Sequence, residues 1–246
     1  ARPMLSDEER LTVVNVVAST RVAEELDLPD IAIQLNCEYE PEQFPGVVYR
    51  VVDPKLAILM FRSGRAVCTG GKNQANIETG IERMIGDLRA AGITTWDLKD
   101  VEIEVQNMVA TYSLFFPEDY DGVAKMDDIN TKVIDAEGGG IRAATDEEVE
   151  EEDERIRGIK QGEPLAALPR RLNLNNLTFH LPFDKVEYEP EQFPGLIYRL
   201  DYPKVVCLIF GSGKMVITGA RHKDEILEAV QFIQDELADL PDYRAM

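Results

Sequence analysis

At residues 38–46 the chain reads Glu-Tyr-Glu-Pro-Glu-Gln-Phe-Pro-Gly, and the same nine residues return, letter for letter, at 187–195. Extended forward without a gap, 38–72 and 187–221 are identical at 20 of 35 positions. A match of that length indicates an internal duplication. Solenoids need three or more short units, so two long copies predict one fold with an internal pseudo-two-fold axis.

We place the first repeat at 1–96 and the second at 97–246, the second being interrupted by an insertion at about 115–168. The insertion holds 16 acidic and 6 basic residues, so half of the net charge of −20 lies in it. A capping-box pattern at 145–148 favours a charged helix near 145–160, and the glycines at 138–140 favour a flexible break. Two interpretations stay open, a solvated loop and a dedicated interaction element.

The charge of the whole chain argues against binding to nucleic acid, because phosphate contacts dominate that affinity. Its distribution argues the other way. Residues 47–72 carry five basic residues and one acidic residue, and 196–221 carry four and one. The repeated segments are therefore basic islands in an acidic protein. An acidic exterior of this kind also fits a host with high internal salt, in keeping with a halophile.

The remaining composition indicates a soluble, intracellular protein. There is no apolar run of membrane length and no signal-peptide pattern at the polar start. Cys37, Cys68 and Cys207 have no CxxC spacing, which favours packed thiols over a disulfide frame or a zinc site. His180 and His222 have no nucleophile at a useful spacing. We expect no metal and no cofactor.

The residue patterns predict an α+β fold. In the first copy, 13–19 reads as a strand, 20–35 as one or two short helices, and 38–46 as a rigid loop because of its two prolines. Three strands follow in each copy, at 47–52, 56–61 and 65–69 in the first. A 3.6-residue period over 77–88, and again over 226–237, predicts a closing helix. The second copy opens with a strand at 101–110.

The strands of the first copy are apolar on both faces, and 56–61 contains no polar residue. Antiparallel sheets with one wet face normally alternate apolar and polar residues. One amphipathic helix covers one face. The other face is therefore expected to be an apolar binding surface.

Several motifs together resemble one family, the TATA-box-binding proteins of archaea and eukaryotes. The resemblance covers roughly 11–114 and 169–240, and the insertion departs from it. It implies a saddle of about ten antiparallel strands with helices on the convex face, and a concave face that lies in the DNA minor groove. The motifs are the doubled nine-residue block, Gln106-Asn107-Met108-Val109-Ala110, the Tyr-Arg pairs ending at Arg50 and Arg199, Pro54-Lys55, Pro203-Lys204, and the Ser-Gly-(Arg/Lys)…Thr-Gly pattern at 63–70 and 212–219.

The resemblance also implies DNA-binding residues, which occur as pairs in the two copies. The wedges that open base steps match Phe44, Phe61, Phe193 and Phe210. The amides at the pseudo-dyad match Asn15 and Asn107. The apolar floor matches Val17, Leu59, Val67, Thr69, Val109, Leu208, Val216 and Thr218. Phosphate contacts match Arg50, Arg65, Lys72, Arg199, Lys214 and Arg221, with Ser63 and Ser212 as further hydroxyl donors.

By the same resemblance the protein is a general transcription initiation factor. It binds and bends A·T-rich promoter DNA, recruits transcription factor B through Glu189, Glu191 and Gln192, and so engages RNA polymerase indirectly. Its free form is open to homodimerisation. The carboxylates of this loop have no His, Ser, Cys or Lys grouped with them, so we expect no catalysis. The alternative is a paralogue that keeps the fold, binds DNA poorly and acts as a regulatory protein-interaction module.

Overall fold

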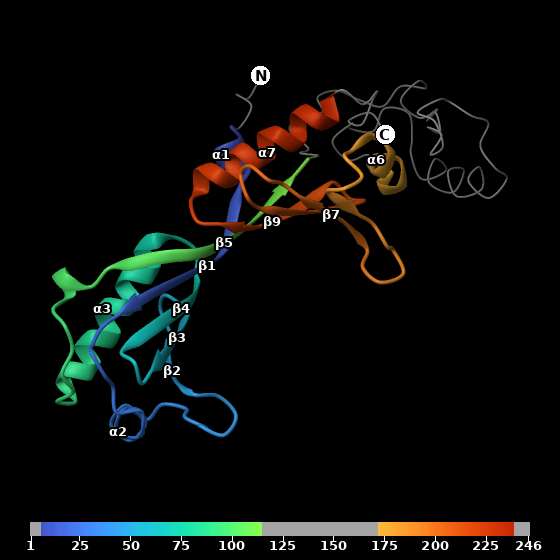
Figure 1. Cartoon of the computed structure of the whole chain (residues 1–246). Coiled ribbons are helices and arrows are strands. Elements are labelled where there is room, and N and C mark those ends of the chain that lie inside the picture. The colour runs from blue at the N-terminus through green and yellow to red at the C-terminus, as the bar shows by residue number, and fades with distance from the viewer. Residues whose placement is uncertain (1–5, 115–171, 239–246) are drawn as a thin grey trace, which may run out of the picture. The chain divides into compact units, whose positions relative to one another are not determined.

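The computed structural model describes residues 6–114 and 172–238 and shows an α+β fold (Figure 1). Nine strands form one sheet in the order β2-β3-β4-β1-β5-β9-β8-β7-β6. The insertion predicted at 115–168, with its helix near 145–160, lies outside the described residues. The strands are β1 (Thr12–Arg21), β2 (Gly46–Val51), β3 (Leu56–Phe61), β4 (Arg65–Gly71), β5 (Ile103–Ser113), β6 (Val186–Glu187), β7 (Gly195–Arg199), β8 (Val206–Phe210) and β9 (Lys214–Ala220).

The order of helices and strands is similar in the two copies. Each copy has a strand, a short helix, a group of antiparallel strands and a long helix, as the duplication predicts. In both copies the strands that follow the nine-residue block begin at its closing glycine. The helices are α1 (Asp7–Arg10), α2 (Leu28–Gln34), α3 (Gln74–Ala90), the 3-10 turn η1 (Leu98–Asp100), α6 (Leu174–His180) and α7 (Lys223–Ala238).

One element is shorter than the sequence indicated. Helix was expected within 20–35, but only α2 is helical there. The residues before it bind the turn between β3 and β4, because the Val22 N–H donates to the Gly64 carbonyl and the Leu26 N–H to the Arg62 carbonyl, both at 2.9 Å. Backbone groups used in this way are not free for a helical ladder. The helix starts where Asp27 caps it, accepting from the Asp30 N–H at 3.1 Å.

Backbone contacts divide the chain into two compact units. The first-repeat unit comprises Thr12–Ala110 and Thr218–Glu225, and the second-repeat unit comprises Ala1–Leu11, Thr111–Ile217 and Ile226–Met246. In the first-repeat unit α3 packs on β1, β3 and β4. Its apolar stripe is fully buried there, against strand residues such as Ile58 and Met60. The residues that recur with the 3.6-residue period in the sequence therefore form the core-facing side of α3.

In the second-repeat unit α7 takes the corresponding role. Its Phe232 ring meets Tyr198 of β7 edge to face, with centroids 6.3 Å apart. The Tyr112 hydroxyl at the end of β5 donates to Asp7 of α1 at 2.6 Å and accepts from Gln234 of α7 at 2.7 Å. Burial, followed by the bond to Asp7, raises the pKa of Tyr112 above its ordinary value. This network fixes the short N-terminal helix, which the sequence analysis did not predict.

None of the described helices is long and apolar enough to cross a membrane. Of the three cysteines, Cys68 and Cys207 are fully buried in the core and Cys37 is half-buried, and all three are free thiols. Burial raises the pKa of Cys68 to about 11 and of Cys207 to about 12. The expectation of packed thiols is confirmed for these two.

The buried thiols predict selective alkylation. Thiolate is the reacting form, and at pH 8 it is scarce at Cys68 and Cys207 and shielded from reagent. In the folded protein we expect iodoacetamide to modify Cys37 first and the other two only after unfolding, as mapped by peptide mass spectrometry. A urea-unfolded sample, in which all three should react, is the control. Rapid modification of Cys207 in the folded protein would contradict the packing described here.

Candidate nucleic-acid interface

Each strand of the first-repeat unit has one covered and one open face. Along β3, Ile58 and Met60 are completely buried toward α3, whereas Leu59 and Phe61, which alternate with them, are only half-buried. Side chains alternate across a strand, and the register pairs Leu59 with Val67 on β4 and with Val48 on β2. Leu59 and Val67 of the predicted apolar floor therefore lie side by side on the face opposite the buried Ile58 and Met60.

The second-repeat unit has the same arrangement. On β8 the Cys207 and Ile209 side chains are completely buried, and Leu208 and Phe210 are half-buried. We call the half-buried side of each unit its open face. None of the 22 residues predicted to contact DNA is buried, and all of them belong to the part of the chain that the structure describes. Which of them contact DNA stays a prediction.

The four phenylalanines form two pairs, one in each unit. Phe44 meets Phe61 with ring centroids 5.8 Å apart and planes at 66°, and Phe193 meets Phe210 at 5.8 Å and 65°. These are edge-to-face contacts, the arrangement that aromatic quadrupoles favour. Phe44 as a residue keeps 36% of its surface exposed. The phenylalanine of each nine-residue block is thus held against the last residue of the second strand after the block, β3 in the first copy and β8 in the second.

A glycine makes room for each pair. A Cβ added at Gly46 would lie 2.6 Å from the Phe44 ring, and one at Gly195 would lie 2.8 Å from Phe193 and 3.0 Å from Phe210. Any side chain here would displace the rings. Gly46 and Gly195 were not among the predicted site residues, although their place at the end of the repeated block was the signal.

The two asparagines are held in the same way in both copies. The Gly70 N–H donates to Asn15 Oδ1 at 2.8 Å, and the Gly219 N–H donates to Asn107 Oδ1 at 2.8 Å. Both glycines have a left-handed backbone, with φ of +99° and +98°. A backbone N–H only donates, so the side-chain oxygen faces it, and this settles which end of the amide is which. The NH₂ groups lie at the other end of each amide. That of Asn107 also donates to the Thr218 hydroxyl at 3.4 Å, which leaves its second hydrogen for another partner.

A β-bulge supports the first of these contacts. Val16 of β1 pairs with Gly71 of β4, but Ala18 pairs with Cys68, so β4 has one residue more than β1 between the two pairs. A bulge of this kind leaves a residue outside the regular ladder. The Gly70 N–H finds its acceptor in the Asn15 side chain instead. The pattern Thr-Gly, present in both copies, is the sequence signal for the position of this glycine.

Half of the predicted phosphate-binding cations already have carboxylate partners. Arg50 pairs with Glu38 at 3.3 Å, Arg199 with Glu187 at 3.2 Å and Arg221 with Glu104 at 3.3 Å. Both side chains of each pair are exposed. Among the described residues, no ion pair is formed by Arg65, Lys72 or Lys214. Ser63 and Ser212 are exposed in the turns before β4 and β9.

Sequence reasoning missed these carboxylates, together with several apolar residues of the open face. Glu38 and Glu187 open the repeated block, twelve residues before their arginines, so the block itself carried that signal. Glu104 is 117 positions from Arg221, and no sequence pattern connects the two. Val48 and Ile197 are half-buried, two residues before Arg50 and Arg199 on the same strands. Strand alternation would have found them.

The loop predicted to receive transcription factor B has the same backbone turn in both copies. The N–H groups of Gln192 and Phe193 donate to the Glu189 carbonyl at 2.9 Å, and those of Gln43 and Phe44 donate to the Glu40 carbonyl at 2.9 Å. Glu189 and Glu191 are exposed, and the Gln192 amide donates to the Glu189 carboxylate. Both loops present exposed carboxylates to solvent.

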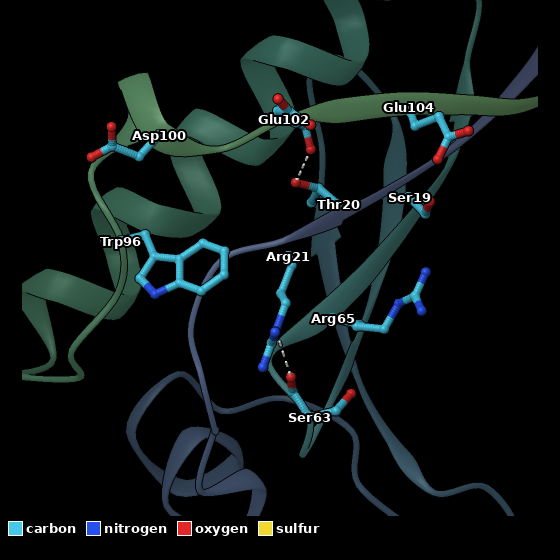
Figure 2. A pocket seen from close by; sticks show the side chains of 9 residues that line it. All are labelled: Ser19, Thr20, Arg21, Ser63, Arg65, Trp96, Asp100, Glu102 and Glu104. Carbon is cyan, nitrogen blue, oxygen red and sulfur yellow. Dashed lines mark hydrogen bonds between the residues drawn. The ribbon is translucent and has the colours of Figure 1, made fainter.

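A polar pocket of about 440 Å³ lies in the first-repeat unit (Figure 2). The Thr20 hydroxyl donates to the Glu102 carbonyl at 2.6 Å, and Arg21 lies over the Trp96 ring at 5.3 Å while donating to the Ser63 carbonyl at 3.3 Å. Two predicted DNA contacts, Ser63 and Arg65, belong to its wall. The full lining is Ser19, Thr20, Arg21, Ser63, Arg65, Trp96, Asp100, Glu102 and Glu104.

A family model described as transcription factor TFIID, or TATA-binding protein, matches residues 10–91 and 165–240. The chain belongs to the TATA-binding protein family. Each matched stretch holds one copy of the nine-residue block, so the resemblance inferred from the sequence is confirmed. This family is one of transcription factors, and the expectation that the chain is not an enzyme agrees with it.

Curated relatives and a solved structure support this membership in the TATA-binding protein family. The TATA-box-binding protein of Thermoplasma volcanium is 41% identical over 234 residues, which are 95% of this chain and 97% of that protein. The TATA-box-binding protein of Haloarcula marismortui is 38% identical over 238 residues, 96% and 98% of the two chains. The structure of Methanococcus jannaschii TBP matches with a TM-score of 0.65 and 36% identity, covering 94% of this chain and 99% of that one.

The close approach of Gly195 to the aromatic pair predicts a stability effect. We expect Gly195→Ala to lower the free energy of unfolding by about 1–3 kcal/mol, the usual range for overpacking, as measured by urea denaturation. Gly211→Ala is the matched control, because the nearest heavy atom to its added Cβ is 3.7 Å away. Equal stability of the two variants would contradict the tight seat described for the rings.

Proposed function

We propose that this protein is a general transcription initiation factor that binds TATA-box promoter DNA in the minor groove through its open faces. The two edge-to-face phenylalanine pairs carry the proposal, because pre-packed aromatic rings that stay half-buried or exposed beside an uncovered apolar face are open to contact by another molecule. Membership in the TATA-binding protein family supports it. Wedge insertion was described for TATA-binding proteins themselves: unstacking costs about a few kcal/mol per base step and is offset by the larger contact that bent DNA allows.

The asparagines give the proposal its base preference. In the minor groove an A·T pair and a T·A pair both present only the acceptors adenine N3 and thymine O2, and a G·C pair adds the guanine N2 amino donor. Asn15 and Asn107 have their oxygens occupied by glycine N–H groups, so their NH₂ groups offer donors to these acceptors. The valine and leucine side chains of the apolar floor offer the guanine amino group no acceptor. A·T-rich sequence is therefore favoured.

Recruitment completes the proposal. Glu189, Glu191 and Gln192 form an exposed acidic loop whose carboxylates suit basic side chains of transcription factor B, and this factor in turn brings RNA polymerase. The first copy has an equivalent loop with Glu40 and Glu42, so the choice between the loops depends on their surroundings. The protein acts without a cofactor, and a homodimer of the free form would have to release its open faces before DNA binds.

One observation favours a second candidate, the DNA-binding-deficient paralogue. Three of the six predicted phosphate-binding cations are paired with carboxylates, and the net charge is −20. Such a protein would act through partners alone. Its exposed wedges and amides would then be without use, which is why the DNA-binding function is preferred.

Titration of a TATA-box duplex across 0.1–2 M KCl separates the two candidates. Six unpaired phosphate contacts would give a slope of log K against log[salt] of about −5. Because binding must break carboxylate pairs, we expect specific binding with a much shallower slope, or affinity that rises with salt. Absence of a gel shift at every salt, with transcription factor B still bound, would instead support the paralogue. A slope near −5 would contradict the role given to the carboxylates.

The wedge function predicts a specific loss. Phe193→Ala combined with Phe210→Ala should reduce DNA affinity at least about ten-fold, since base–aromatic stacking contributes about 1–3 kcal/mol per base. Bending, followed by energy transfer between dyes at the duplex ends, should fall with it. Binding of transcription factor B to the free protein should not change.

The control for the wedge variant is Phe179→Ala combined with Phe183→Ala. These rings are in the same unit, are 65% and 88% exposed and belong to α6 and the turn after it. These two substitutions should leave the bending of DNA unaltered. Equal loss of DNA binding and of transcription factor B binding in the wedge variant would mean misfolding and would remove this support for the function.

A further inference from the structure

The ion pair between Arg221 and Glu104 has no counterpart in the other repeat. Arg221 corresponds to Lys72 through the repeated block. Glu104 lies three residues before Asn107, so it corresponds to Thr12, three residues before Asn15. The Arg50–Glu38 and Arg199–Glu187 pairs, in contrast, are copies of each other. The second sequence copy therefore has a carboxylate, Glu104, that the first copy lacks.

Glu104 is close to more than one predicted phosphate contact. Its Oε1 is 3.3 Å from Arg221 Nη1, and its side chain also lines the polar pocket with Arg65 of β4. Figure 2 shows Glu104, Ser19 and Arg65 together, on the side of the pocket away from Trp96. All of these residues belong to the first-repeat unit as defined by backbone contacts. A phosphate bound between Arg65 and Arg221 would lie beside this carboxylate.

We propose that Glu104 is a positioning residue that sets how strongly, and at what salt concentration, this part of the open face binds a DNA phosphate. In the free protein its carboxylate holds the Arg221 guanidinium. When Arg221 turns to a phosphate the carboxylate loses its partner and faces a second anion. This inference rests on the proposed DNA-binding function and adds a residue to it that neither the family resemblance nor the sequence pattern indicated.

The size of the effect follows from exposure. The Arg221 and Glu104 side chains are 56% and 65% exposed, and exposed pairs contribute little to stability. Removing the carboxylate should therefore hardly change folding. Repulsion between the carboxylate and a phosphate is screened over about 10 Å in 0.1 M salt and about 3 Å in 1 M salt. Glu104 thus opposes DNA most in dilute salt and least in concentrated salt.

The test compares Glu104→Gln with Glu102→Gln in the full-length protein. Both substitutions remove one negative charge from β5 or the residue just before it, and both side chains line the same pocket, but Glu102 forms no ion pair with any described residue. Affinity for a TATA-box duplex is measured by fluorescence anisotropy in 0.1 M and 1 M KCl. Arg221→Gln and the Arg221→Gln, Glu104→Gln double variant complete a mutant cycle.

We expect Glu104→Gln to bind roughly two- to five-fold tighter than the unaltered protein at 0.1 M KCl, with the gain nearly gone at 1 M. The slope of log K against log[salt] should become more negative. Glu102→Gln should have a smaller effect, and Glu104→Asp should behave as the unaltered protein. In the Arg221→Gln background, Glu104→Gln should lose the part of its effect that comes from competition for the guanidinium and keep only the part due to repulsion of the phosphate. Urea midpoints should agree for all variants.

Two results would overturn the inference. If Glu104→Gln and Glu102→Gln change affinity equally, only net charge matters, and the proposed DNA-binding function stands without Glu104. If the effect of Glu104→Gln persists undiminished in the Arg221→Gln background, the pair is not its cause. Failure of the unaltered protein to bind the duplex at either salt would instead count against the proposed function itself, so the two failures are distinguishable.

Discussion

The structure depends on one-sided packing of its strands. In each unit a long helix buries one face of the sheet, and fully buried residues such as Ile58, Met60, Cys207 and Ile209 alternate with half-buried ones. Hydrophobic burial behind the sheet supplies the main favourable term of folding. The half-buried residues on the opposite face, among them Leu59 and Leu208, therefore contribute less to the core. Their apolar character agrees with the proposed DNA-binding function, in which another molecule covers them.

The open-face groups are held in place before any partner arrives. Phe44 packs on Phe61 and Phe193 packs on Phe210, and the glycine beside each pair leaves the space that the rings need. Each asparagine oxygen is bound by a glycine N–H. Groups fixed in advance lose little conformational entropy on binding, so more of the contact energy appears as affinity. The same local solution occurs twice, as duplication of a whole structural unit would produce.

Much of this was accessible from the sequence because the informative contacts are local or repeated. The loop at 38–46, strands β2 to β4 and helix α3 follow from prolines, short apolar runs separated by turn residues, and a 3.6-residue period, and the second copy follows from the first. Contacts between distant positions were not accessible. Arg221 and Glu104 are 117 positions apart and Gly70 and Asn15 are 55 apart. The helix expected near residue 20 failed for the same reason, since Val22 and Leu26 bind a turn some forty residues away.

The repeats of the sequence and the compact units of the structure divide the chain differently. The chain passes from one unit to the other after Leu11, Ala110, Ile217 and Glu225. Two strands, β5 and β9, therefore have residues in both units. Separate expression of the two sequence repeats would give fragments that each lack part of the unit they should form. Although the sequence is a tandem duplication, each compact unit is built from segments of both sequence repeats.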